Sequence, residues 1–185
     1  GLLAGQQDYE PQPTDGGLAW FHERHVSVVH NTPQIVSLRL VWRAFAGGVH
    51  GMTETAFRSL DPRTGAEVGP ADILAEGFED SLLPLVEARF REAHDVEEGS
   101  SLADAGFVFD DDTFALPENV RIDGAGLAFY YNLYEVAPYA FGPTEIAVTW
   151  DELEGLLKPG IRAAVQGRSE ELTVPRGAQE PGELP

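Results

Sequence analysis

Residues 35–60 have the sequence IVSLRLVWRAFAGGVHGMTETAFRSL, and this stretch decides the fold class. Apolar side chains at positions 36, 38, 40 and 42 recur every second residue, as in a strand with one buried face. Glycines at positions 47, 48 and 51 then mark a tight turn or bulge, and residues 52–60 can pair back as the next strand. Residues 20–31 form another alternating segment before this pair. Three successive strands with short turns predict an antiparallel meander.

The clearest helix follows this meander. Leu82, Val86 and Phe90 form one apolar stripe at helical spacing. The sequence predicts an N-cap at residue 80 or 81, which would place Pro84 in the first turn, where proline is tolerated. We expect this main helix to cover one face of a sheet.

A second group of strands is expected after the helix. The candidates are residues 107–109, 112–116, 120–122, 127–133 and 145–148. Thr149 and Glu152 have the spacing of a capping box, which predicts a short C-terminal helix that ends near Gly160. Strands, a helix, more strands and a second helix predict an α+β fold, not the regular alternation of a parallel α/β sheet.

Composition divides the chain into one folded unit and two tails. Residues 1–17 contain many Gln, Pro and Gly residues and predict a flexible N-terminal tether. Residues 161–185 predict a flexible acidic tail that contains Pro and Gly. Residues 18–160 are expected to form a single α+β domain, and 43% apolar residues suffice for a sizeable core.

The charge and residue composition exclude several classes of function. A net charge of −19 argues against a nucleic-acid partner and favours a basic one. The absence of cysteine excludes disulfides, thiol catalysis and cysteine zinc sites. No apolar run is long enough for a membrane helix, so we expect no membrane insertion by this chain itself.

Candidate metal sites are weak in this sequence. His22 and His25 lack the spacing of the zinc-peptidase motif, and whether they converge with His50 on a three-histidine site stays open. The run Asp110-Asp111-Asp112 is typical of a solvated turn, with a calcium site as the alternative. We expect no metal and no cofactor.

The sequence assigns no catalytic residue. It contains no Gly-x-Ser-x-Gly elbow, no cysteine nucleophile and no glycine-rich phosphate loop. We therefore do not expect an enzyme. The alternative is a cell-wall glycan hydrolase, or an enzyme associated with deacetylation, that uses His50 with nearby carboxylates.

Two segments have the composition of a recognition surface. The first is Gly47-Gly48-Val49-His50-Gly51, in which glycines imply positive φ angles around a histidine. The second, residues 127–143, is an aromatic strand followed by an aromatic loop that contains prolines and a glycine. The predicted ligand-binding residues are His50, Tyr134, Glu135, Tyr139 and Phe141. The alternative is that His50 bonds a backbone carbonyl and that the tyrosine rings are buried.

These two segments, in this order, resemble an extracytoplasmic domain family. Gly47 to Gly51 is similar to the Gly-Gly-Ala-His-Gly motif of RsiV-like anti-sigma factors, with Val49 in place of alanine. Residues 130–142 resemble the Phe-x-x-Tyr-Glu-Ile-Ala-Pro-Tyr-Ala-x-Gly signature in the C-terminal part of the same family. The similarity covers about residues 20–158.

The resemblance implies a domain outside the cytoplasmic membrane of a bacterium, periplasmic or at the cell surface, as a lipoprotein or anchored by a segment outside this sequence. The lysozyme-sensing anti-sigma factor of this family binds lysozyme through this domain. The resemblance therefore implies a non-catalytic binding domain whose partner is a basic protein such as lysozyme or a cell-wall component. A structural spacer module is the remaining alternative.

Overall fold

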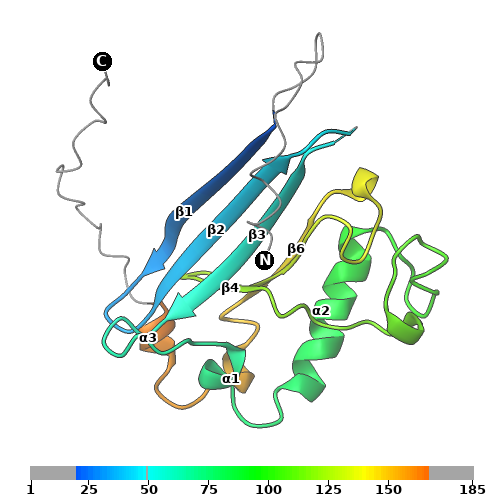
Figure 1. The fold of residues 1–185 in the computed structure, drawn as a ribbon. Helices are drawn as coiled ribbons and strands as arrows, with labels where there is room; N and C mark the ends of the chain where they lie inside the picture. The colour runs from blue at the N-terminus through cyan, green and yellow to red at the C-terminus, as the bar shows by residue number, and fades with distance from the viewer. Residues whose placement is uncertain (1–19, 49, 167–185) are drawn as a thin grey trace, which may run out of the picture.

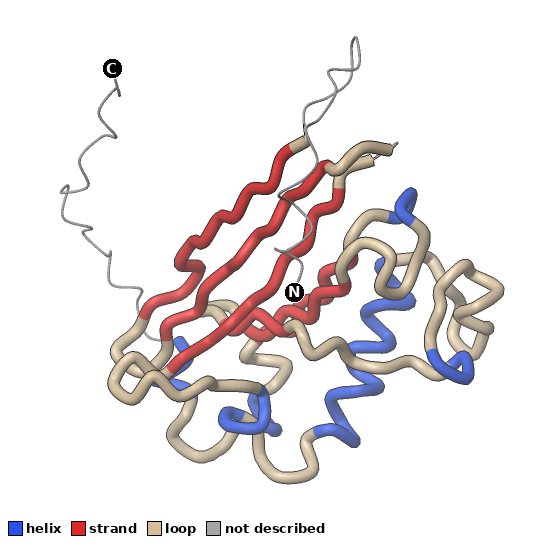
Figure 2. Tube along the Cα trace, viewed as in Figure 1, coloured by secondary structure: helices blue, strands red, loops and turns tan. Residues whose placement is uncertain are grey.

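Two antiparallel three-stranded sheets form the framework of the computed structural model, which describes residues 20–48 and 50–166 (Figures 1 and 2). The first sheet has the order β1-β2-β3, with β1 at Phe21–Asn31, β2 at Val36–Phe45 and β3 at Met52–Leu60. The second has the order β4-β5-β6, with β4 at Val120–Ile122, β5 at Gly126–Tyr131 and β6 at Thr144–Thr149. The predicted tether at 1–17 and the tail beyond residue 166 lie outside the described residues.

Short helices and turns connect these strands. The α-helices are α1 (Pro70–Ile73), α2 (Glu79–Ala93) and α3 (Arg162–Gln166), and the 3₁₀ turns are η1 (Asp110–Asp112), η2 (Tyr139–Phe141) and η3 (Glu154–Leu156). The α+β prediction is confirmed: a meander, one main helix, a second strand group and a short C-terminal helix. The structure adds that α2 contacts β6, so the second sheet lies between the first sheet and α2 (Figure 1).

The hydrophobic core lies between α2 and the second sheet. Leu82, Val86 and Phe90 are fully buried along one face of α2, as their spacing predicts. On β6, Ile146 and Val148 are buried while their neighbours are exposed, which is the alternation of a strand with one core face. The first sheet contributes less to this core and extends beyond it (Figure 2).

The start of α2 differs from the prediction. The helix begins at Glu79 with Phe78 as N-cap, and the Leu82 amide donates to the Phe78 carbonyl at 2.8 Å. Pro84 therefore lies in the second turn, not in the first. Because proline has no N–H, the Asp80 carbonyl has no amide partner at the usual position.

Two predicted strands, at residues 107–109 and 112–116, are wrong. These residues are irregular or turn, and the turn η1 lies between them. Three of their aromatic side chains face the core for a different reason, because Phe107, Phe109 and Phe114 all pack around the ring of Phe90. The apolar pattern of these residues reflects an aromatic cluster in a loop. A short apolar run has the same appearance in the sequence whether it forms a strand or such a loop.

The C-terminal part packs past the predicted boundary at residue 160. The capping box is present, because Glu152 Oε2 accepts from the Thr149 amide at 3.0 Å, but it leads into a turn and η3. Val165 on α3 is fully buried, and the Thr32 hydroxyl donates to the Ala164 carbonyl at 3.2 Å. The packed unit therefore includes α3.

Two asparagines join the sheets along the outer edge of β3. The Phe57 amide donates to Asn119 Oδ1 at 2.8 Å, and the Thr55 amide donates to Asn132 Oδ1 at 2.8 Å. Asn119 Nδ2 donates in turn to the Thr55 carbonyl at 2.7 Å. The side-chain amides thus bond backbone groups that another strand would otherwise pair with.

In the part of the chain that the structure describes, no helix has both the length and the apolar character needed to cross a membrane.

Candidate functional site

His50 and Tyr139 stack on each other. Their ring centroids are 4.5 Å apart and their planes differ by 14°. His50 belongs to the β2–β3 hairpin and Tyr139 begins the turn η2, and these segments lie side by side at one end of the molecule (Figure 1). The structure therefore brings together the glycine-histidine turn and the aromatic loop that the sequence singled out.

Tyr134 extends this stack. Its ring centroid lies 5.6 Å from that of Tyr139, and the residue is 54% exposed. The Tyr134 backbone has φ of 64°, in the left-handed region that residues other than glycine rarely adopt. Glu135 holds this turn, because its Oε2 accepts from the Asn132 amide at 2.7 Å. Glu135 thus has a local structural contact in addition to its predicted ligand-binding role.

Phe141 and Val108 border the same loop. Phe141 is 47% exposed and packs edge-on against Phe107, with ring centroids 5.3 Å apart. Val108 is 72% exposed, and its amide donates to the Val136 carbonyl at 2.8 Å. The sequence did not indicate Val108, because a lone valine in a predicted strand carries no sign of exposure. We call His50, Tyr134, Tyr139 and Phe141 the aromatic corner.

Glycines shape both segments of the aromatic corner. Gly47 and Gly48 have φ of 92° and 99°, as the sequence predicted for the turn before His50. Gly142 ends η2 with φ of 73°. Because side chains disfavour these angles, the backbone geometry that presents His50 and Tyr139 depends on glycine.

The other histidines and acidic residues considered in the sequence lie elsewhere. His22 and His25 point to opposite faces of β1, since an odd number of steps separates them. Within residues 20–48 and 50–166, no group of three His, Cys, Asp or Glu side chains is placed to hold a metal ion. The turn Asp110–Asp112 is exposed, and Asp112 Oδ1 accepts from the Ala103 amide at 2.8 Å.

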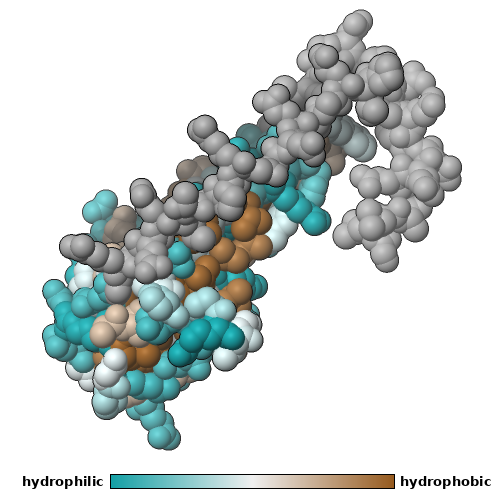
Figure 3. All heavy atoms as spheres, turned by 90° about the vertical axis from the view of Figure 1, so that its left-hand side faces the viewer, coloured by the Kyte–Doolittle hydropathy of each residue, from teal (hydrophilic) through white to brown (hydrophobic). Residues whose placement is uncertain are grey.

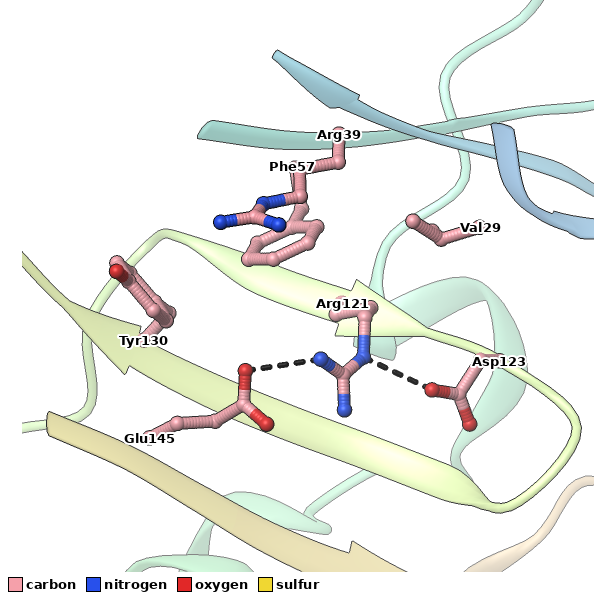
Figure 4. A pocket seen from close by; sticks show the side chains of 7 residues that line it. All are labelled: Val29, Arg39, Phe57, Arg121, Asp123, Tyr130 and Glu145. Atoms are coloured by element: carbon pink, nitrogen blue, oxygen red, sulfur yellow. Dashed lines mark hydrogen bonds and ion pairs between the residues drawn. The ribbon is translucent and has the colours of Figure 1, made fainter. Parts of the chain in front are cut away.

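A second feature, which the sequence did not indicate, is a polar cleft between the two sheets (Figure 4). Its cavity is about 400 Å³ and is lined by Val29, Arg39, Phe57, Arg121, Asp123, Tyr130 and Glu145. Arg121 donates to Asp123 Oδ2 and to Glu145 Oε2, both at 2.8 Å, and its guanidinium lies 5.6 Å from the Phe57 ring centroid. Residues from both sheets meet here, and no sequence spacing relates them.

The carboxyl pKa shifts have structural causes. Hydrogen bonds from Arg63 lower the pKa of Asp61 to about 2 in the turn after β3. Hydrogen bonds from Thr149 lower the pKa of Glu152 in the capping box. Both carboxylates therefore stabilise turns in their ionised form.

Two solved structures resemble this chain, whereas no curated protein matches it. A solved structure from Bacteroides fragilis, of a member of the DUF3298 family, is 24% identical with a TM-score of 0.68, over 83% of this chain and 61% of that one. A DUF3298 family protein from Pseudomonas aeruginosa is 22% identical with a TM-score of 0.58, over 76% of this chain and 63% of that one.

The chain thus shares its fold with these two proteins and spans somewhat less than two thirds of their length. The range that matches a family model includes the motif at residues 130–142 and not the one at residues 47–51. That match is to the family described as a protein of unknown function, DUF3298, over residues 71–151 of this chain.

Proposed function

We propose that this chain is a non-catalytic binding domain of the bacterial envelope, outside the cytoplasmic membrane, and that the aromatic corner is its recognition surface. The observation that carries the proposal is the exposed stack of His50 on Tyr139, extended by Tyr134. Tyrosine rings in a fixed loop give large contact area at little entropic cost, as in many protein recognition surfaces.

The strained backbone of Tyr134 supports the same function. A residue other than glycine in the left-handed region costs roughly 1–3 kcal/mol, and such strain is concentrated at functional sites. The Glu135 carboxylate holds the backbone of this turn, and the ring of Tyr134 packs against that of Tyr139. A fixed, exposed ring favours binding because less side-chain freedom is lost on contact.

The proposed partner is a basic protein of the lysozyme type, with a cell-wall component as the alternative. The resemblance of both motifs to the RsiV-like domain supports lysozyme. The net charge of −19 supports a basic partner, because opposite charge accelerates encounter and disfavours acidic competitors. Charge alone does not select one basic protein, so the aromatic corner would supply the shape.

Calorimetric titration with lysozyme tests this function. We expect binding at about 0.15 M salt that persists at about 0.5 M, where screening leaves mainly short-range contacts. Tyr139→Ala should weaken binding by about 2 kcal/mol or more, because it removes the central ring of the surface. Tyr139→Phe keeps the ring and should retain most of the affinity.

Val26→Ala is the matched control, since Val26 is exposed on β1 and lies outside the aromatic corner. Binding that vanishes at high salt would mean only attraction between an acidic and a basic protein, and would remove lysozyme as the partner. Equal affinity of wild type and a folded Tyr139→Ala variant would exclude the aromatic corner as the surface.

A further inference from the structure

A trough lined by arginines runs over the inner face of the first sheet, apart from the aromatic corner. Side chains alternate along β2, so Arg39, Val41 and Arg43 all point to the face that carries Phe57 on β3. Arg39 lines the cleft between the sheets, and it also lines a second cavity of about 350 Å³ with Glu23, His25, Val41 and Arg43. Arg39 is thus the lining residue that the two cavities share.

Arg39 and Arg43 have no charged partner among the residues that the structure describes, in a molecule with a net charge of −19. Among the described residues, neither makes an ion pair or a hydrogen bond, whereas Arg58, Arg63, Arg89, Arg91, Arg121 and Arg162 each pair with a carboxylate. Arg24 also lacks such a partner among the described residues, but it lies on the opposite face of the sheet, so Arg39 and Arg43 are the two arginines of this kind on the inner face. Arg39 and Arg43 are four residues apart on one face of β2, so their Cα atoms lie about 13 Å from each other.

The floor of the cleft is fixed and offers complementary groups. Arg121 is clamped between Asp123 and Glu145, which sets the orientation of both carboxylates (Figure 4). The Tyr130 ring packs edge-on against Phe57, with centroids 5.7 Å apart, and lines the cleft from β5. The trough thus combines free guanidinium groups, oriented carboxylates and an aromatic ring.

We propose that this trough binds a linear oligosaccharide that carries carboxylate groups. Arg39 and Arg43 would each bind a carboxylate of the sugar chain through paired N–H donors. Glu145 and Asp123 would accept hydrogen bonds from sugar hydroxyls, and the ring of Tyr130 would contact a pyranose face. This inference does not depend on the aromatic corner or its partner.

The position of β2 favours a glycan over an acidic peptide. Extended peptides often bind by adding a strand to a free sheet edge. Both edges of β2 are already paired, with β1 and β3, so its backbone has no edge to offer. Recognition at this face must come from side chains alone, which suits a ligand rich in hydroxyl and carboxylate groups.

The test is calorimetric titration of the whole chain with tetragalacturonate, with neutral maltotetraose as the comparison. We expect tetragalacturonate to bind and maltotetraose not to bind measurably. Arg39→Ala and Arg43→Ala should each weaken binding about tenfold or more, as expected for the loss of a charge-assisted hydrogen bond. Arg39→Lys, which keeps the charge but not the fork of donors, should weaken it less.

Arg24→Ala is the matched control, because Arg24 is exposed on the opposite face of the same sheet, and its loss changes the net charge equally. It should bind as wild type does. Because Arg39 and Arg43 are exposed, their variants should melt as wild type does, so lost binding would not reflect unfolding. Absence of tetragalacturonate binding, equal weakening by Arg24→Ala, or tighter binding of a tetraglutamate peptide would each overturn the proposal.

Discussion

Phe90 is the residue around which the helix side of the core is organised. Its ring contacts five others, those of His94, Phe107, Phe109, Phe114 and Tyr131, at centroid distances between 4.7 and 5.7 Å. Phe90 lies on α2, and the five partner rings come from its C-cap residue His94, the following loop and β5. A single side chain therefore fixes an irregular loop to a helix and a sheet.

Phe90→Ala should lower the free energy of unfolding by about 3–5 kcal/mol, because it leaves a cavity that rings from several segments cannot fill together. Urea unfolding followed by circular dichroism measures the change. Val108→Ala, at an exposed site in the same loop, should change stability by less than about 0.5 kcal/mol. A Phe90→Ala loss as small as that of Val108→Ala would contradict the packing described here.

His30 makes stability depend on pH. Its side chain is buried, and Nε2 has no hydrogen-bond partner within residues 20–48 and 50–166. Burial lowers its pKa, although Asp123 acts in the opposite direction. Since the folded state disfavours the charged imidazole, the unfolded state binds more protons as the pH falls. The stabilising contribution is therefore complete above the unfolded pKa of about 6.5 and is lost as pH falls through the lower folded pKa.

His94 changes the stability with pH in the same direction, because burial lowers its pKa as well. We expect the free energy of unfolding to fall between about pH 7 and pH 5, and to fall less steeply in His30→Gln and least in the double variant with His94→Gln. Chemical denaturation at several pH values measures these slopes. Identical slopes in wild type and the double variant would exclude both histidines as the source.

At the scale of elements, the joint between the sheets depends on Asn119 and Asn132. Asn119→Ala removes the acceptor of the Phe57 amide and a donor to the Thr55 carbonyl, at a part-buried site. It should cost about 1–3 kcal/mol, because a backbone group near the core loses its partner. Urea unfolding gives the cost, and amide hydrogen exchange at Phe57 should accelerate.

Asn132→Ala is the comparison for this experiment, because Asn132 bonds the Thr55 amide instead. Its effect on exchange should be largest at Thr55 and smaller at Phe57. Exchange at Phe57 that is unchanged in Asn119→Ala would show that β3 is held by other contacts.

Elements with a strong hydrophobic periodicity could be predicted from the sequence. Elements whose structure depends on contacts with residues distant in the sequence could not. The meander and α2 follow from alternation and from the stripe of Leu82, Val86 and Phe90. Phe107 and Phe114 looked like strand residues because an aromatic cluster leaves the same apolar signal as a sheet. The start of α2 was placed too late, because Phe78 caps it by backbone geometry without a capping side chain.

At the scale of the molecule, the aromatic corner was predictable in its parts. Glycines beside His50 and the prolines around Tyr139 indicated fixed turns, and the structure places those two rings in contact. The cleft between the sheets was not predictable, because Arg39 and Arg121 come from strands that nothing in the sequence pairs. Local geometry is encoded in neighbouring residues, whereas a cleft depends on how whole sheets are placed.

The eleven-residue strand β1 has β2 as its only strand neighbour within the described residues. A long open edge of this kind is a template on which a second chain can assemble into an aggregate. The run from His22 to His25 places polar and charged groups on both faces of that edge, and the bulge at Val29 breaks its regular spacing. The same strand also exposes Phe21, Val26 and Val28, so polar and apolar side chains share this surface (Figure 3). Charged groups and a bulge are the features by which edge strands disfavour such assembly, so His22 to His25 would oppose the growth of a fibre from this edge.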